Sequence, residues 1–134
     1  MEGLYESGED YLETILIISQ RKGSVRSIDI ANEMELSKPS ISRAVGILKN
    51  KNLIVVDEDG FIILTDEGKK IAKKIYERHQ VLTEALILLG VDSKTAAKDA
   101  CRIEHDLSES SFTKIKKHMK EYKAQKKQEE NKKK

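Results

Sequence analysis

Side chains that commonly bind metal ions gather in three short segments of this chain. The first holds two carboxylates, the second a single histidine, and the third a thiol, a carboxylate and an imidazole. The six residues are Asp10, Glu13, His79, Cys101, Glu104 and His105. Helical residues three or four positions apart share a face, so side chains converge within the first and third segments if both are helical. Thiolate, carboxylate and imidazole form a typical set of transition-metal ligands, and the sequence therefore predicts a metal site.

Each of these segments also has a purely structural interpretation. Ser7 and Asp10 have the spacing of a capping box, in which the carboxylate bonds back to the residue that caps the helix. Glu13 alone would be an ordinary surface charge. His79 lies in an apolar stripe, where a histidine can be a hydrogen-bonded core residue, and Cys101 can be a buried thiol beside an exposed Glu–His pair. The residue types alone leave these alternatives open.

The segment between the carboxylate pair and the lone histidine has the order of elements of a winged helix-turn-helix. We expect a first helix over 9–20, a short helix over 28–34 that is capped by Ser27, and a third helix over 38–50. Two β-branched runs, at 53–56 and 61–64, then predict a hairpin that would form the wing. This order predicts a DNA-binding module in which the third helix enters the major groove.

The first turns of the predicted third helix carry the candidate DNA contacts. They are Ser37, Lys38, Pro39, Ser40, Ser42 and Arg43. The planar fork of Arg43 can pair both acceptors of a guanine, and the small serine hydroxyls suit phosphates and a close approach. The alternative is that Ser-x-Pro-Ser merely opens an ordinary helix, with Ser37 as the N-cap and Pro39 in the first turn.

After the hairpin the pattern becomes entirely helical. Thr65 is expected to cap a long helix that ends at Gly90, and Ser93 to cap a fifth helix that continues through Leu107. A sixth helix should follow. The fold class is therefore mainly α, with a winged helix-turn-helix domain and an all-helical domain. The predicted parts are 1–65 for the winged domain, 66–122 for the helical domain and 123–134 for a disordered basic tail.

Composition and charge restrict the class of protein. The longest apolar runs have four or five residues, so no membrane partner is expected. A single cysteine cannot form an internal disulfide and the N-terminus has no signal pattern, which favours the cytoplasm. The net charge is +2, but residues 123–134 contribute +4 and residues 1–122 carry −2. A DNA binder with this balance must focus its basic residues on one face or gain charge from bound cations.

Several short motifs occur in a fixed order along the chain. They are Glu9-Asp-Tyr-Leu-Glu13, the third helix, Leu64-Thr-Asp-Glu-Gly-Lys-Lys70, Arg78-His79, Leu89-Gly-Val91 and Ile103-Glu-His-x-Leu-Ser108. With them the chain resembles the diphtheria-toxin-repressor family of metal-dependent transcriptional repressors, especially the short manganese-transport-regulator branch. The resemblance implies that the six candidate ligands form one or two adjacent metal sites. It also implies homodimers that assemble through the helical domain and bind palindromic operators on double-stranded DNA.

Two departures from the family pattern concern the identity of the metal. The manganese branch typically has glutamate where this chain has Cys101, and the iron branch has methionine where it has Asp10. Thr83 and Ala97 occupy positions where the iron branch has further ligands. A thiolate favours Fe(II), Co(II) or Zn(II), whereas carboxylates favour Mn(II). We expect Mn(II) or Fe(II) as the cofactor, with Co(II) and Zn(II) as possible surrogates.

The expected function is metal-dependent repression of metal-uptake genes, without enzymatic activity and without a small organic substrate. One alternative is a winged-helix regulator that senses an oxidant or an organic ligand through Cys101. A second is a metal-dependent hydrolase with Cys101 and His105 as nucleophile and base, although no glycine-rich loop or oxyanion-hole motif is present. A third is a winged helix that binds protein instead of DNA.

Overall fold

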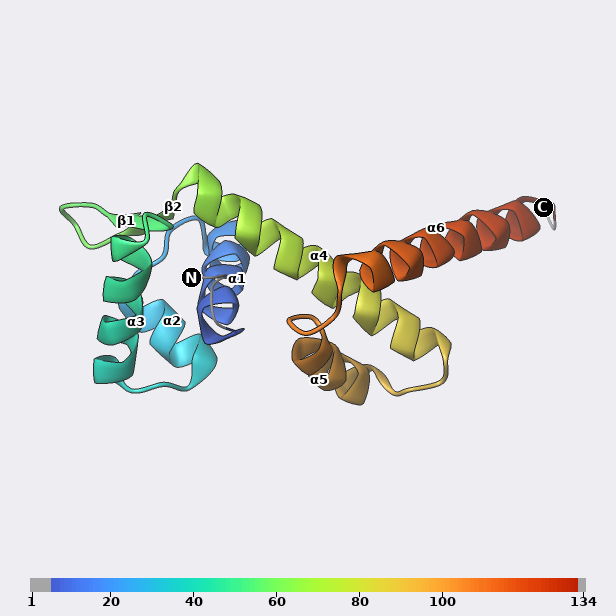
Figure 1. The fold of residues 1–134 in the computed structure, drawn as a ribbon, viewed down its shortest axis with the longest axis horizontal. Helices are drawn as coiled ribbons and strands as arrows, with labels where there is room; N and C mark the ends of the chain where they lie inside the picture. The colour runs from blue at the N-terminus through green and yellow to red at the C-terminus, as the bar shows by residue number, and fades with distance from the viewer. Residues whose placement is uncertain (1–5, 133–134) are drawn as a thin grey trace. The chain divides into compact units, whose positions relative to one another are not determined.

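The structure, a computed structural model, describes residues 6–132 (Figure 1). Within them lie six helices and one two-stranded sheet, which confirms the predicted mainly α class. The chain divides into two compact units, Met1–Tyr76 and Glu77–Lys134. Their boundary lies inside the long helix α4 (Asp66–Leu88), eleven residues beyond the predicted boundary at 65. The first turns of α4 belong to the first unit because Ala72 is part of its core.

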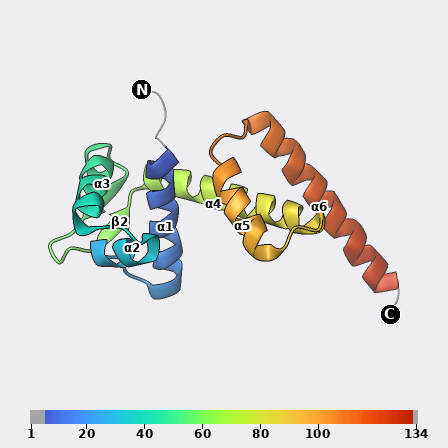
Figure 2. The same cartoon turned by 90° about the horizontal axis from the view of Figure 1, so that it is seen from below.

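The first unit is the predicted winged helix-turn-helix. Its elements in order are α1 (Glu6–Lys22), α2 (Ser27–Met34), α3 (Lys38–Asn50), β1 (Ile54–Val56) and β2 (Ile62–Leu64). Figures 1 and 2 both show α2 and α3 beside α1. No helix among residues 6–132 is long and apolar enough to cross a membrane.

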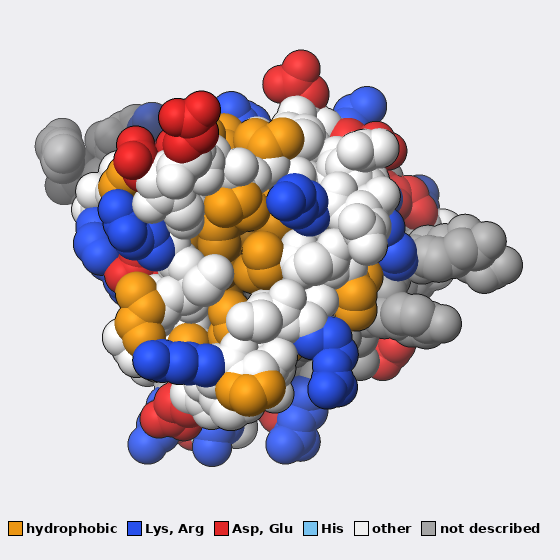
Figure 3. All heavy atoms as spheres, turned by 90° about the vertical axis from the view of Figure 1, so that its left-hand side faces the viewer, with side chains coloured by type: hydrophobic (Ala, Val, Ile, Leu, Met, Phe, Trp, Pro, Cys, Tyr) orange, Lys and Arg blue, Asp and Glu red, His pale blue; other side chains and the backbone are white. Residues whose placement is uncertain are grey.

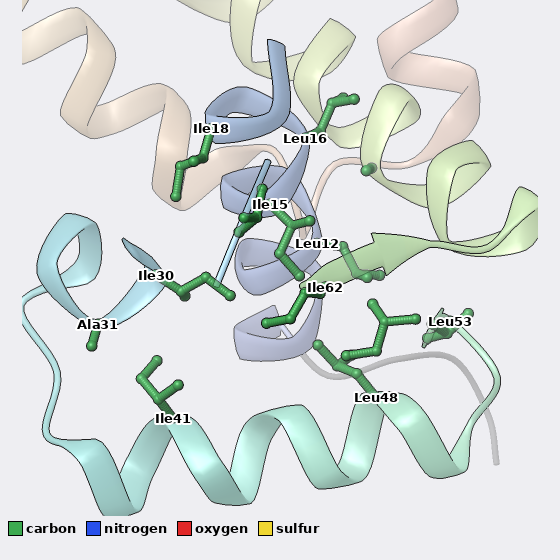
Figure 4. Close-up of a cluster of buried hydrophobic side chains, with 13 residues drawn as sticks. Leu12, Ile15, Leu16, Ile18, Ile30, Ala31, Ile41, Leu48, Leu53 and Ile62 are labelled. Atoms are coloured by element: carbon green, nitrogen blue, oxygen red, sulfur yellow. The ribbon is translucent and has the colours of Figure 1, made fainter. Parts of the chain in front are cut away.

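A single hydrophobic core joins these elements (Figure 4). Its members are Leu12, Ile15, Leu16, Ile18, Val25, Ile30, Ala31, Ile41, Leu48, Leu53, Ile54, Ile62 and Ala72. Each large buried side chain contributes about 1.5–3 kcal/mol relative to an exposed one. Because α3 places Ile41 and Leu48 in this core, its opposite face is held toward solvent in a fixed orientation.

The turn between α2 and α3 is set by backbone geometry and one side chain. Glu35 adopts a left-handed conformation, with φ of 54°, and the N–H of Leu36 donates to the carbonyl of Ala31 at 2.9 Å. Ser37 then caps α3 as predicted, because its hydroxyl oxygen accepts from the Ser40 N–H at 3.3 Å. Helix α3 therefore begins at the residue predicted from the sequence.

Two other predicted caps are wrong. Ser27 is already helical, and the residue that caps α2 is Arg26, whose N–H donates to the Asp29 carboxylate at 2.9 Å. That carboxylate also accepts from Lys22, and these bonds hold the pKa of Asp29 below its usual range. Ser7 lies inside α1, which begins no later than Glu6, so Ser7 is not the cap of that helix.

The wing is an antiparallel hairpin in which Val55 lies opposite Ile63. These two side chains face outward, whereas Ile54 is buried in the core. The connecting turn is held by Asp57, whose carboxylate accepts from the Phe61 N–H at 2.9 Å. Gly60 supplies the required left-handed conformation there, with φ of +84°, as Asp-Gly hairpin sequences predict.

After the wing, Thr65 connects β2 to α4 within the first unit. Its side chain caps the helix by accepting from the Gly68 N–H at 3.1 Å, as predicted. It also donates to the carbonyl of Asn52 at 2.8 Å. At Gly68 the helix passes so close to Leu53 that a Cβ would overlap the carbonyl oxygen of that residue.

The second unit contains the rest of α4, α5 (Ser93–Ile103) and α6 (Glu109–Lys132). Gly90 ends α4 with φ of +102°, as predicted. The cap of α5 is Asp92, one residue before the predicted Ser93, and its carboxylate accepts from the Thr95 N–H at 3.0 Å. The buried hydrophobic side chains of this unit are Leu82, Ala96, Ala100, Phe112 and Met119.

Two predictions for the second unit differ from the structure. Helix α5 ends at Ile103, so Leu107 lies outside it, in a turn that separates α5 from α6. Helix α6 continues to Lys132, where a disordered tail was expected from residue 123. Lys123 forms an ion pair with Glu84 of α4 at 2.6 Å, and the following Ala, Gln, Glu and Lys residues all favour helix.

Candidate metal centre and DNA-reading helix

A fully buried carboxylate, Glu104, lies at the centre of the ligand cluster in the second unit. One of its oxygens, Oε2, lies 2.9 Å from Nδ1 of His79. The other, Oε1, lies 3.5 Å from Nε2 of His105, which is longer than a normal hydrogen bond. Among the described residues no donor forms a hydrogen bond to Oε1. A buried anionic oxygen is costly unless it is paired, so this atom is suited to binding a cation.

The thiol of Cys101 belongs to the same cluster. Its Sγ lies within 4.8 Å of a carboxylate oxygen of Glu104, and the residue is exposed. Exposure contradicts the alternative of a buried structural cysteine. The second unit therefore brings together thiol, carboxylate and imidazole side chains, and this donor set fits a divalent transition metal.

The third segment of candidate ligands is only partly helical, which corrects the geometry that the sequence suggested. Cys101 is in the last turn of α5, but Glu104 and His105 lie in the turn that follows. Glu104 keeps helical dihedral angles and its N–H donates to the carbonyl of Ala100 at 2.9 Å. Its side chain therefore still lies near that of Cys101, three residues earlier.

The position of this turn depends on Arg78, a residue to which the sequence assigned no role. Arg78 is only 6% exposed. Its Nη1 donates to the carbonyls of Glu104 at 3.0 Å and Leu107 at 2.6 Å, and its Nη2 contacts Glu109 at 3.2 Å. The guanidinium also lies over the ring of Phe112, 5.1 Å from its centroid. Arg78 is thus a positioning residue that fixes the backbone carrying two candidate ligands.

A signal for Arg78 was present in the sequence. It follows Ile75 by three residues and precedes Leu82 by four, and both of those are buried. A charged residue at an apolar position of a helix must have partners if it is buried.

The carboxylate pair lies on α1 in the first unit. Asp10 and Glu13 are three residues apart on this helix. Glu13 is only 7% exposed, so the interpretation as an ordinary surface charge is wrong. The capping-box interpretation of Asp10 is also wrong, because Ser7 is inside the helix. Neither the capping box nor an ordinary surface charge therefore accounts for these two carboxylates. Their role as metal ligands stays a prediction.

The candidate DNA contacts occupy the start of α3. All six of them, Ser37, Lys38, Pro39, Ser40, Ser42 and Arg43, are exposed. The helix contains three basic residues and no acidic one, and Lys51 follows it directly. The first unit therefore focuses positive charge on its recognition helix although residues 1–122 are net negative.

An exposed recognition helix with a wing, together with a helical unit that clusters metal-type ligands, defines a metal-dependent DNA-binding regulator. Comparison with known proteins agrees. Residues 3–60 match the family domain described as iron dependent repressor, N-terminal DNA binding domain. Residues 65–131 match the domain described as iron dependent repressor, metal binding and dimerisation domain.

Individual relatives point to one branch of this family. The HTH-type transcriptional regulator MntR of Bacillus subtilis (strain 168) is 34% identical over 109 residues, which are 81% of this chain and 77% of that protein. The transcriptional regulator MntR of Escherichia coli O6:H1 is 33% identical over 104 residues, or 78% of this chain and 67% of that protein. The solved structure of the manganese regulator SloR superposes with a TM-score of 0.76 at 26% identity. It covers 84% of this chain, which spans about half (53%) of the SloR chain.

The chain belongs to the iron-dependent, or diphtheria-toxin, repressor family and to its manganese-transport-regulator branch. It is a metal-dependent DNA-binding transcriptional regulator and not an enzyme. This confirms the family, fold and class of cofactor predicted from the sequence, and neither the hydrolase nor the oxidant-sensor alternative is favoured.

Proposed function

We propose that this protein is a cytoplasmic homodimer that binds palindromic operators when loaded with Mn(II) or Fe(II) and thereby represses metal-uptake genes. The observation that carries the proposal is the fully buried Glu104 carboxylate, which lies between two imidazoles and near an exposed thiol. The names of the MntR relatives and the match to a metal-binding and dimerisation domain support the same function.

The six candidate metal ligands of this proposal are those that the family resemblance implies. His79, Cys101, Glu104 and His105 would supply the ligands of the second unit. Asp10 and Glu13 would supply those of α1, as the family resemblance implies. Binding of a divalent ion would relieve the mutual repulsion of the three carboxylates. It would also restrict the motion of α1, so that each dimer pays less ordering entropy when it binds DNA.

The donor set combines ligands that prefer different metals. Cys101 favours a borderline ion such as Fe(II), whereas Asp10 and Glu13 favour the harder Mn(II). The exposure of Cys101 means that its thiolate can reach an ion without a buried charge having to be created. We expect binding of either metal to release protons, because imidazole and thiol must be deprotonated to bind it.

Thermal unfolding of metal-stripped protein under anaerobic conditions tests this proposal. A ligand that binds only the folded state stabilises it by about 2.7 kcal/mol at 100 times its Kd. Mn(II) or Fe(II) should therefore raise the unfolding temperature, and Glu104→Gln should remove most of that increase. Glu121→Gln, an exposed substitution on α6, is the matched control and should respond as the wild type does.

Operator binding provides the functional half of the test. EDTA should release the protein from DNA, and Mn(II) added in excess should restore binding. If no ion raises the unfolding temperature, the metal proposal is wrong. If Glu104→Gln binds DNA with an unchanged response to metal, Glu104 is not a ligand that controls DNA binding.

A further inference from the structure

One large apolar side chain, Ile47, is exposed on the polar face of the recognition helix. It is 47% exposed, although α3 buries Ile41, Ala44 and Leu48 on its other face. Ile47 follows Arg43 by four residues and Ser40 by seven, and this spacing places all three on one face. Ile47 is not part of the core of the first unit, so its exposed side chain is available for contact with DNA.

The surface around Ile47 is open and positively charged. A Cβ added at the neighbouring Gly46 would meet no atom within 4 Å, so the helix surface next to Ile47 is open at that point. Lys49 lies two residues further along the exposed part of the helix. Figure 3, which views the side with α3 and the hairpin, shows Lys and Arg side chains around exposed hydrophobic ones.

The major groove offers one apolar group that such a side chain can recognise. Among the four base pairs, only those with thymine present a methyl group there, and apolar side chains pack against it. Between Arg43 and Ile47 the helix advances about 6 Å, at about 1.5 Å per residue. Successive bases on one strand are about 3.4 Å apart, so the two side chains would be about two base steps apart along the groove.

We infer that Ile47 is a specificity-determining residue that contacts the C5-methyl group of a thymine, about two base steps from the base contacted by Arg43. This inference rests on the proposed function, because it requires that α3 enters the major groove of an operator. Arg43 would read a guanine through hydrogen bonds, and Ile47 would add a preference for thymine through apolar contact. The operator half-site would then contain both determinants at a fixed spacing.

The expected size of the effect follows from the burial of one methyl-sized group. Such burial is worth about 0.8 kcal/mol, which corresponds to a factor of about 4 in Kd per half-site. Within one half-site, removal of the methyl group from the DNA and truncation of the side chain should each cost about this factor. The two losses should not add, because both abolish the same contact.

The test uses the metal-loaded full-length dimer and an operator selected from random duplex DNA. Each thymine of one half-site is replaced in turn by deoxyuridine, which lacks only the methyl group, and Kd is measured at constant salt. For wild-type protein one position should weaken binding about 4-fold. Ile47→Ala loses the contact in both half-sites, so it should bind the thymine operator about 16-fold more weakly and be insensitive to deoxyuridine at that position.

Ile63→Ala provides the matched control, because Ile63 is equally exposed but lies on the wing instead of α3. It should keep the wild-type response to deoxyuridine at the Ile47 position. The inference is overturned if no deoxyuridine weakens wild-type binding, or if Ile47→Ala stays sensitive at the same thymine. The second result would assign the methyl contact to another residue. Failure of the metal-loaded protein to select any sequence would instead refute the proposed function itself.

Discussion

Replacement of Arg78 by alanine tests whether one buried guanidinium fixes the turn that carries Glu104 and His105. The substitution removes the donor to two main-chain carbonyls, those of Glu104 and Leu107. A buried polar group left without its partner costs about 1–3 kcal/mol, which is the loss expected for the buried Glu104 carbonyl. The Leu107 carbonyl is only partly buried and should add less. The ion pair with Glu109 adds little, because the Glu109 side chain is 66% exposed.

Urea unfolding of the metal-stripped protein measures this loss without any contribution from the metal. Arg78→Lys keeps the positive charge but not the planar fork that donates in several directions, so its stability should lie between those of the wild type and Arg78→Ala. Glu109→Gln is the control for the exposed ion pair with Arg78, and it should lower the free energy of unfolding by less than about 1 kcal/mol.

The same substitution should weaken metal binding. Groups that orient metal ligands typically change affinity about 10- to 100-fold when they are mutated. We therefore expect Mn(II) to bind Arg78→Ala at least 10-fold more weakly under conditions in which the protein is fully folded. Unchanged stability of Arg78→Ala, or an equal loss in Glu109→Gln, would refute the reasoning about the buried carbonyls. Unchanged metal affinity in a destabilised variant would show that the turn is not part of the metal site.

Four further substitutions test other parts of the structure. Gly68→Ala would place a Cβ against the carbonyl of Leu53, so urea unfolding should show a loss of stability of more than about 2 kcal/mol. A loss of stability below about 0.5 kcal/mol, the usual limit for surface changes, would exclude the close approach. Arg43→Ala should weaken operator binding by about 1–3 kcal/mol and relax specificity at one base pair. Lys49→Ala should instead weaken binding to all sequences alike. Competition with mutated operators would show both effects. Because the folded-state pKa of Asp29 is depressed, its contribution to stability is present at neutral pH and is lost as the pH falls below the ordinary carboxyl range. Acid unfolding of Asp29→Asn should accordingly show a weaker dependence on pH than that of the wild type.

The recognition helix was predictable because local rules determine where it begins. Ser37 accepts from the Ser40 N–H and Pro39 occupies the first turn, so sequence neighbours alone place the start of α3. The wing followed for the same reason, since Asp57 and Gly60 fix its turn within a few residues.

The end of α5 was not predictable in this way. The apolar periodicity continues from Ala100 to Leu107, but the chain leaves the helix after Ile103. The carbonyls of Glu104 and Leu107 bind Arg78, which precedes them by more than 25 residues. A long-range donor therefore decides the geometry of the turn, and no local pattern records it. Because of this contact, the candidate ligands that follow Ile103 lie in a turn instead of on the face of a helix.

The network around Glu104 also shows how the backbone of the proposed metal site is held in place. Arg78 holds main-chain carbonyls, so the backbone of the turn is fixed independently of the ligand side chains. The Glu104 carboxylate is already removed from water, and an ion gains this ligand without a further cost of burial. In the proposed mechanism, binding free energy is then available to order α1 through Asp10 and Glu13. A coupling of about 1–3 kcal/mol between two sites changes affinity about 5- to 150-fold, which is a sufficient range for a repressor that responds to metal.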